Sequence, residues 1–355
     1  MKKHVLIILL LVCSLVVFAG CANNNEPQAE VPTTITLIDN AGREVELPYP
    51  VETVVVANRY NSELIRAIGA IDRVIAVDMN TAQDREFWSE FDPDNTIGRG
   101  QRELNYEKII ELAPQVLITP KNGSWEEDQE VLAPFGIKVF VVSGYDTFDF
   151  INQVTNLGKM FGEEQGAENF IAWYRGIADY ITTNVAKVEP RTVFLETLTE
   201  FSTTFEGDFF YGMVDLSGGQ HIFQTRPEGL TGTVINPEDV ILRNPEVIVK
   251  MITPDHALSG TGLYEAPKPE QSRRVIEEIK NRPAWDEIAA VQNNEVYVMS
   301  QFGHGGASKL VGAAYMAKWI YGDALPGLDP VEIERQWMED LQGFSFVEGH
   351  FYPLP

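Results

Sequence analysis

The residues of this sequence that could bind a small molecule are arginines and aromatic residues in segments between apolar runs. The planar N–H donors of an arginine match a carboxylate or an oxyanion, and an aromatic face stacks on the rings of an organic ligand. Glycines around Arg99 and His304 would let the backbone approach a ligand closely. We therefore expect a ligand that is anionic, partly aromatic or both. The candidate ligand-binding residues are Arg59, Tyr60, Arg99, Trp125, Tyr211, Arg226 and His304.

The histidines do not form a metal-binding pattern. Four of the five histidines follow residue 20, and they are widely separated, with no His-x-His or His-x-x-x-His spacing. A dedicated site for a bare zinc or manganese ion is therefore not expected. His304 could be an axial ligand to haem or cobalt, although a histidine in a polar loop is more often structural. We expect no resident cofactor, and we expect any metal to arrive inside a chelator or as an oxoanion.

Motifs for catalysis are missing from the sequence. It has no Gly-x-Ser-x-Gly elbow, no P-loop and no His-Glu-x-x-His pattern. Glu200, Asp208 and Asp215 are carboxylates, but their spacing does not require an acid/base role. An enzyme is therefore not expected.

The candidate residues need a scaffold, and the chain alternates short apolar runs with helical patterns, which indicates an α/β architecture. A hairpin is expected first, closed by the turn residues at 39–42. Short unbroken apolar strands between helices predict a mostly parallel sheet that is covered on both faces. Loops at the carboxyl ends of such strands are where ligands bind. The strands expected in the first half lie at 53–57, 73–78, 115–119 and 138–142.

The middle of the chain predicts a helical connection between two such halves. Residues 148–187 show helical spacing without proline, with one break expected near 162–166, and a second α/β series starts at Thr192. Within that series, residues 237–250 align without gaps on residues 106–119, each as a short helix, a proline and a buried strand. We therefore expect two similar lobes.

The first residues have the layout of a secretory signal. Lys2 and Lys3 precede an apolar run over 5–18 that is too short for a comfortable membrane span, and Ala19-Gly20 stand before Cys21. The sequence Phe-Ala-Gly-Cys resembles a bacterial lipobox, in which the cysteine is acylated, so Cys21 is the expected lipidation site. The polar segment after it suits a flexible tether. The chain's other cysteine, Cys13, lies in the segment that would be removed.

The composition limits the surfaces that the protein can bind. The chain has 52 Asp and Glu against 27 Lys and Arg, a formal net charge of −25. Such a surface should not bind nucleic acid or anionic lipid, so contact with the membrane is expected through the lipid anchor alone. The anchored protein is expected to be extracytoplasmic.

Several segments in a fixed order resemble one family. They are residues 35–45 (ITLIDNAGREV), 63–78 (ELIRAIGAIDRVIAVD), 105–118, 218–222 (GGQHI) and the two proline-containing segments at 237–240 and 245–249. Together, behind a lipobox, they resemble the substrate-binding proteins of ABC importers, in the class whose lobes are joined by one rigid helix. This class of periplasmic binding proteins delivers ferric siderophores, haem, cobalamin and, in some members, molybdate or tungstate.

The resemblance implies a fold of two Rossmann-like three-layer lobes, joined by a single long α-helix, with the ligand cleft between them. The expected parts are a signal peptide (1–20), a tether (21–32), an N-terminal lobe (33–146), the connecting helix (147–188), a C-terminal lobe (189–325) and a segment packing on the body (326–355). The implied partners are an ABC permease dimer with its cytoplasmic ATPase, and the protein itself is expected to be a monomer.

The resemblance also implies two permease-docking carboxylates, one exposed on each lobe. Their positions match Glu63 and Asp215, where the family more often has Glu at the second position. The alternative is that both are solvated acids on helix faces. Exposed charges of this kind orient a partner, although each contact is modest and sensitive to salt.

Three functions remain open from the sequence. The first is capture of a metal chelate, such as a ferric siderophore, haem or a corrinoid, for delivery to a permease. The second is binding of molybdate or tungstate, because a small oxoanion needs few N–H groups and an arginine or two. The third is a sensory surface lipoprotein that reuses the same fold.

Overall fold

The computed structural model describes residues 33–146, 149–255 and 262–354. The expected signal peptide, the tether with Cys21, and His256 lie outside the described residues. Residues 33–355 cluster as one compact unit. Within its described part, no helix is long and apolar enough to cross a membrane.

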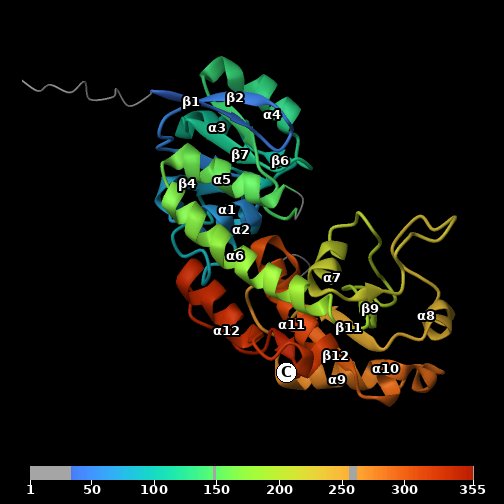
Figure 1. Ribbon diagram of the computed structural model, residues 1–355. Coiled ribbons are helices and arrows are strands. Elements are labelled where there is room, and N and C mark those ends of the chain that lie inside the picture. The colour runs from blue at the N-terminus through green and yellow to red at the C-terminus, as the bar shows by residue number, and fades with distance from the viewer. Residues whose placement is uncertain (1–32, 147–148, 256–261, 355) are drawn as a thin grey trace, which may run out of the picture. The chain divides into compact units, whose positions relative to one another are not determined.

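The first lobe is built on a parallel four-stranded sheet with the order β4-β3-β7-β8 (Figure 1). The expected hairpin precedes it as an antiparallel pair, β1 (Thr34–Ile38) and β2 (Glu44–Pro48). The sheet strands are β3 (Val54–Val56), β4 (Val74–Val77), β7 (Val116–Thr119) and β8 (Lys138–Val141). The remaining elements are α1 (Arg59–Ala67), α2 (Met79–Ala82), the small pair β5 (Gly98–Gly100) and β6 (Glu103–Leu104), α3 (Tyr106–Leu112) and α4 (Trp125–Leu132).

The second lobe is built on a five-stranded sheet with the order β10-β9-β11-β12-β13, in which only the β12–β13 pairing is antiparallel. Its strands are β9 (Thr192–Glu196), β10 (Gln220–His221), β11 (Val247–Ile252), β12 (Val296–Ser300) and β13 (Phe351–Tyr352). Its helices are α7 (Tyr211–Ser217), α8 (Pro237–Arg243), α9 (Pro269–Lys280), α10 (Ala289–Gln292), α11 (Lys309–Tyr321) and α12 (Pro330–Arg335).

Both sheets bury side chains on both faces, as the unbroken apolar strands predicted. In the first lobe, Val54 and Val56 belong to one apolar cluster with residues of α1 and α5, whereas Val55 belongs to another with residues of α3 and α4. In the second lobe, Val193 and Phe194 are divided between two clusters in the same way. Each parallel sheet is therefore sandwiched between helices.

The internal repeat predicted from the sequence is present in three dimensions. The two aligned segments form α3 with β7 and α8 with β11, and each strand lies beside the first parallel strand of its sheet. Both helices end on a left-handed residue, Ala113 with φ 47° and Asn244 with φ 45°, and a proline follows each. Numbered by appearance, the first four parallel strands of each lobe have the order 2-1-3-4.

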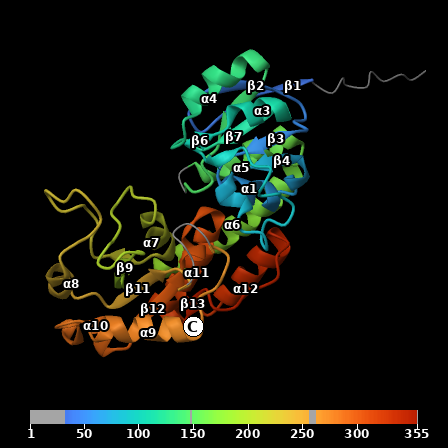
Figure 2. The same ribbon diagram turned by 180° about the vertical axis from the view of Figure 1, so that it is seen from behind.

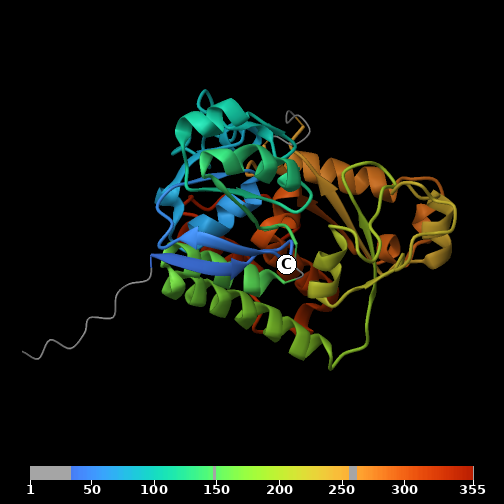
Figure 3. The ribbon, with the colours of Figure 1, turned by 90° about the horizontal axis from the view of Figure 1, so that it is seen from above.

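The break expected near 162–166 is confirmed, and it divides the connection into two helices, so the single long helix implied by the resemblance is not continuous. Gly162, with φ 71°, ends α5 (Phe150–Phe161), and α6 (Glu164–Val185) begins two residues later. A Cβ on Gly158 would lie 2.5 Å from the Cβ of Ala167, so α5 folds back closely against α6. Figure 3 shows the blue hairpin beside these green helices, with α5 packed on the first lobe and α6 leading on to the second.

The C-terminal segment packs along α6 before it returns to the second lobe (Figure 2). Trp173 Nε1 of α6 donates a hydrogen bond to Gln336 Oε1 at 2.9 Å, and Trp337 lies against the rings of Phe170 and Trp173. After a π-helical turn at Gln336–Leu341, the chain passes both lobes and adds β13 to the second sheet. This segment therefore braces the connection made by α6.

Two glycines on α6 provide a paired stability test. A Cβ at Gly166 would lie 2.0 Å from the carbonyl oxygen of Ile68, whereas a Cβ at the exposed Gly176 would meet no atom within 4 Å. We expect Gly166→Ala to lower the free energy of unfolding by about 1–3 kcal/mol. Gly176→Ala should raise it by about 0.5–1 kcal/mol, because alanine has the better helix propensity. Urea unfolding measures both, and equal effects would contradict the close approach of α6 to the first lobe.

Candidate functional site

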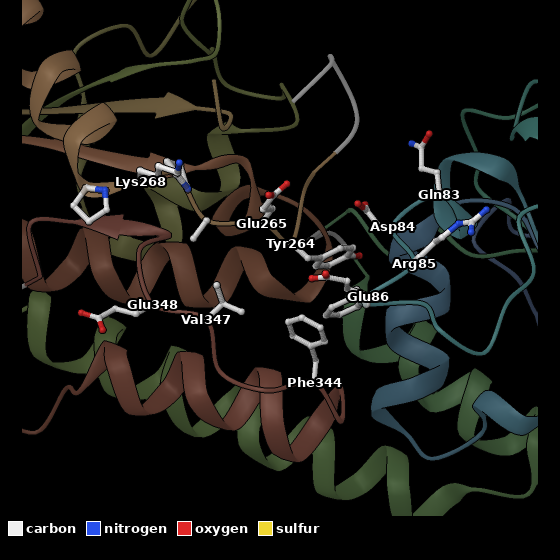
Figure 4. Close-up of a pocket in the computed structure, with 14 residues that line it drawn as sticks. Gln83, Asp84, Arg85, Glu86, Tyr264, Glu265, Lys268, Phe344, Val347 and Glu348 are labelled. Carbon is white, nitrogen blue, oxygen red and sulfur yellow. The ribbon is translucent and has the colours of Figure 1, made fainter. Parts of the chain in front are cut away.

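A pocket lies where loops of the two lobes meet, beyond the carboxyl ends of β4 and β11, as expected for parallel sheets. Its volume is about 590 Å³. In Figure 4, Tyr264 and Phe344 lie between chain segments of both lobes, with Glu86 close to them. The lining residues come from three segments, namely Gln83–Phe87 of the first lobe, Tyr264–Pro269 of the second lobe, and Phe344, Val347 and Glu348 of the C-terminal segment.

Aromatic rings form the floor of this pocket. The rings of Phe87 and Tyr264 stack with centroids 3.5 Å apart and planes 2° apart, and Phe344 lies 5.1 Å from Phe87. Trp88 meets both Phe87 and Tyr264 edge-on. Because Phe87 belongs to the first lobe and Tyr264 to the second, the floor is also a direct contact between the lobes.

The rim of the pocket carries charges of both signs. Asp84 forms an ion pair with Arg59 at 3.5 Å. Burial raises the pKa of Asp84, although Arg59 and the backbone N–H groups of Gly262 and Leu263 stabilise its ionised form. The other charged lining residues are Arg85, Glu86, Glu265, Lys268 and Glu348. A rim with this balance is not a site for collecting a small anion.

Glu63 lies beneath the floor, and the expectation that it is an exposed docking residue is wrong. Its side chain is 1% exposed, and it accepts a hydrogen bond from the hydroxyl of Tyr264. Gln342 Nε2 donates to the backbone carbonyl of Glu63 at 3.1 Å, so the C-terminal segment meets the same point. Burial raises the pKa of Glu63 to about 7. Asp215, on α7, is exposed as expected.

A second contact between the lobes surrounds Lys309. Its Nζ donates to the carbonyl oxygens of Tyr145, in the first lobe, at 2.9 Å and of Phe209, in the second lobe, at 3.0 Å. Burial lowers the pKa of Lys309 to about 8. The ring of Phe209 lies 5.5 Å from Tyr145 and 6.3 Å from Tyr60. Side chains therefore fill this part of the junction.

Three of the candidate residues proposed from the sequence lie at the junction, which is where the two lobes meet. Arg59 is behind the pocket wall, paired with Asp84, and Tyr60 packs closely against Gly305 and Gly306 of the second lobe. His304 is 3% exposed, and its ring lies against Phe209 and Phe210. Its Nδ1 meets the carbonyl oxygen of Gln301, and burial lowers its pKa to about 3. A ring enclosed in this way argues against the axial-ligand role.

None of the seven candidates is among the residues that line the pocket, and the other four lie elsewhere on the two lobes. Arg99 is 78% exposed beside a separate cavity of about 190 Å³, and the guanidinium of Arg43 covers the ring of Trp125. Tyr211 is buried near His221. Arg226 pairs with Asp208 at 3.0 Å and lies over Phe205. Arg99 lies on β5, and Trp125 and Tyr211 are the first residues of α4 and α7, so these three are not in loops. The four side chains found partners within their own lobe.

Sequence reasoning missed the residues that line the pocket. The segment 264–269 follows a predicted strand, so the same strand-end rule could have included it. Phe87 and Phe344 gave no local signal, because their meeting depends on how the C-terminal segment crosses the lobes. In residues 33–146, 149–255 and 262–354, no group of three or more His, Cys, Asp or Glu could hold a metal ion.

Comparisons with known proteins agree with this geometry. A family model described as "Periplasmic binding protein" matches residues 54–301. An uncharacterized ABC transporter substrate-binding lipoprotein, YvrC of Bacillus subtilis, is 22% identical over 339 residues, covering 91% of this chain and 99% of the relative. The iron(3+)-hydroxamate-binding protein FhuD of the same organism is 26% identical over 306 residues, 83% of this chain and 89% of the relative.

Solved structures support the fold. The TroA-like periplasmic binding protein FepB of Veillonella parvula aligns with a TM-score of 0.73 at 20% identity, over 90% of this chain and all of that one. The molybdate-binding MolA of Haemophilus influenzae aligns with a TM-score of 0.64 at 14% identity, over 88% of this chain and 99% of that one. At these identities the likeness describes the fold and not the ligand.

The Asp84–Arg59 pair offers a test of how the pocket wall is held. Asp84→Asn removes the carboxylate beside a guanidinium that is 11% exposed. We expect the free energy of unfolding to fall by about 1–3 kcal/mol, because a largely buried charge loses one of its partners. Asp94→Asn, at an exposed position of the same lobe, is the control and should change little. Thermal or urea unfolding distinguishes them, and two equal curves would mean that the pair does not stabilise the wall.

Proposed function

Because the chain belongs to the periplasmic binding protein family, we propose that it is the substrate-binding component of an ABC importer. This family consists of binding proteins and not of enzymes. The observation that carries the proposal is the pocket itself, which joins two similar parallel-sheet lobes at their strand ends. Such a site would capture a ligand between the lobes, and the protein would then deliver that ligand to a permease.

We propose that the ligand is a metal chelate, such as a ferric siderophore, haem or a corrinoid. A pocket of about 590 Å³ lies within the size range of sites for organic ligands and greatly exceeds the volume of a tetrahedral anion. The half-buried ring of Phe344, beside the stacked pair of Phe87 and Tyr264, offers apolar surface to a chelator. The relatives include the hydroxamate-binding protein above and a vitamin B12-binding protein of Photorhabdus laumondii, 26% identical over 147 residues.

The oxoanion alternative receives less support from the geometry. Binding molybdate or tungstate would require arginines or N–H groups that converge on a small cavity. Instead, the nearby Arg59 is paired with Asp84, and Arg226 is paired with Asp208 far along the second lobe. A sensory surface lipoprotein with the same fold remains the other alternative. The sensory role would be favoured if the protein bound a chelate but did not stimulate the ATPase activity of any permease.

We propose small movements of the lobes during delivery. α6 and the C-terminal segment both connect the lobes, and a helix bends less than a pair of flexible strands. The proposed partners are a permease dimer with its ATPase, with Asp215 as the docking residue on the second lobe and the protein acting as a monomer. Extracytoplasmic anchoring through Cys21 belongs to the same proposal.

A ligand panel tests the proposed chelate. The body from residue 33 onward, which is one compact unit, is titrated with ferrichrome, haem, cobalamin, molybdate and tungstate. One of the chelates should raise the melting temperature, because a ligand at 100 times its Kd stabilises the folded state by about 2.7 kcal/mol. A response to molybdate or tungstate alone would replace the chelate with the oxoanion.

Aromatic truncation locates the site. Phe344→Ala removes a half-buried lining ring and should weaken binding of the responding chelate about tenfold, or about 1.4 kcal/mol. Phe135→Ala, at a ring that is 57% exposed away from the pocket, is the matched control and should leave Kd unchanged. Kd is measured by quenching of intrinsic fluorescence, and equal affinities in both variants would place the ligand elsewhere.

A further inference from the structure

The carboxyl group of Glu63 is an acid buried at the contact between the lobes. One oxygen accepts the hydrogen bond from Tyr264 of the second lobe. Within the described part of the chain, the other oxygen, Oε2, is buried without a hydrogen-bond partner. This oxygen faces the backbone of the second lobe, since a Cβ built on Gly306 would lie 2.7 Å from it. One carboxyl group of the first lobe therefore meets two segments of the second.

The charged groups around Glu63 do not neutralise it directly. On its own helix, Arg59 pairs with Asp84, and Arg66 pairs with Glu90 and donates to the carbonyl oxygen of Phe87. Both guanidinium groups stabilise the ionised carboxylate only by longer-range attraction. Within residues 33–146, 149–255 and 262–354, the other titratable groups of the junction include Tyr60, Asp78, Tyr264, His304, Lys309 and His350.

An ionised carboxylate at this point carries a cost in free energy. Water is excluded from Oε2, and an unsatisfied charged oxygen loses its hydration without compensation. A protonated carboxyl group avoids the larger cost of burying a charge. Desolvation accordingly raises the pKa of Glu63 to about 7, even though the bond from Tyr264 lowers it.

We propose that a proton on Glu63 strengthens the closed arrangement of the lobes beside the pocket, so that this carboxyl group makes closure and ligand affinity greater in acidic than in alkaline solution. The part of the inference that concerns ligand affinity rests on the proposed function, whereas the part that concerns the lobes does not. The coupling follows from Tyr264, which bonds Glu63 and also forms the floor of the pocket with Phe87. Separating the lobes at Glu63 would therefore take the floor apart.

The direction of the pH effect follows from the two states. When the lobes open, Glu63 meets water and regains an ordinary pKa near 4.5, whereas in the closed state its pKa is about 7. The closed state thus binds the proton more tightly, and its advantage is fully present below about pH 4.5. The advantage is lost as the pH rises from there to about 7, and it stays lost above that.

Other groups of the junction also titrate, among them His304 and Lys309. Burial lowers the pKa of His304 to about 3, so its effect has the opposite sign and strengthens closure as the pH rises towards its ordinary value. Burial lowers the pKa of Lys309 to about 8, so its own contribution changes above the range of Glu63. Both groups are present in a Glu63→Gln variant. Dividing the equilibrium constant for lobe closure of the variant by that of wild type therefore leaves only the effect of the Glu63 carboxyl group.

The experiment measures the distance between the lobes without any ligand. Spin labels are attached to Glu107→Cys and Glu238→Cys, two exposed positions that correspond in the internal repeat, on α3 and α8. The two native cysteines both precede the body that starts at residue 33. Distance distributions are recorded by pulsed electron resonance at pH 5, 6, 7 and 8.

We expect the Glu63→Gln body to be closed to a similar extent as wild type at pH 5, within a few-fold. At pH 8 its closing equilibrium should exceed that of wild type by roughly 10- to 100-fold, the range given by a shift of two to three pKa units after allowance for solvent. Glu334→Gln is the matched control. Glu334 is a second buried acid, bonded by Tyr315 away from the pocket, with a pKa raised to about 8 by burial. Its variant should follow wild type in the distance between the lobes.

A ratio between Glu63→Gln and wild type that is constant from pH 5 to 8 overturns the inference. If Glu63→Gln does not fold, Tyr264→Phe provides the test, because it removes a donor that stabilises the ionised carboxylate. The loss of closure should then continue to higher pH than in wild type, and an unchanged pH profile would contradict the inference. Ferrichrome binding at the same pH values separates the two proposals. A lobe distance that responds as expected without binding of any chelate would refute the proposed ligand and leave this inference standing.

Discussion

The stacked pair of Phe87 and Tyr264 is the contact on which the pocket depends, because the same two rings join the lobes and form the floor. Both rings are held from behind by residues of the first lobe. Phe87 is fixed by Trp88 and by the guanidinium of Arg66, and Tyr264 by its bond to Glu63. A binding surface built in this way exists only while the lobes touch, so recognition and lobe contact are not separate properties of the molecule.

The regular part of the fold could be predicted from the sequence because local patterns determine it. Apolar runs gave the parallel strands, and the repeated helix–proline–strand unit gave two lobes of equal strand order. The glycines near 162–166 predict the break between α5 and α6, but they do not predict that α5 folds back on α6. The closeness of Gly158 to Ala167 turns a break into a fold-back, and that contact depends on packing rather than on helical spacing.

The site was harder to predict, because the partner of a side chain cannot be seen in its neighbours along the chain. Arginines such as Arg59 and Arg226 suggest ligand contacts, yet this acid-rich chain supplies each of them with an internal carboxylate. Glu63 shows the opposite error. An acid near the start of a helix suggested an exposed position, but the second lobe covers that face of α1. The rule for parallel sheets predicts that a pocket lies beyond strand ends, whereas the particular side chains that converge there could not be predicted.

The wall contributed by Phe344, Val347 and Glu348 has a consequence for the order in which the protein matures. A ribosome that adds residues from the amino end completes every parallel strand of both sheets by Ser300, well before Phe344 emerges. The wall of the pocket is therefore synthesised after the strands of both sheets. A chain that ends before Phe344 would keep every parallel strand and would lack one wall of the pocket.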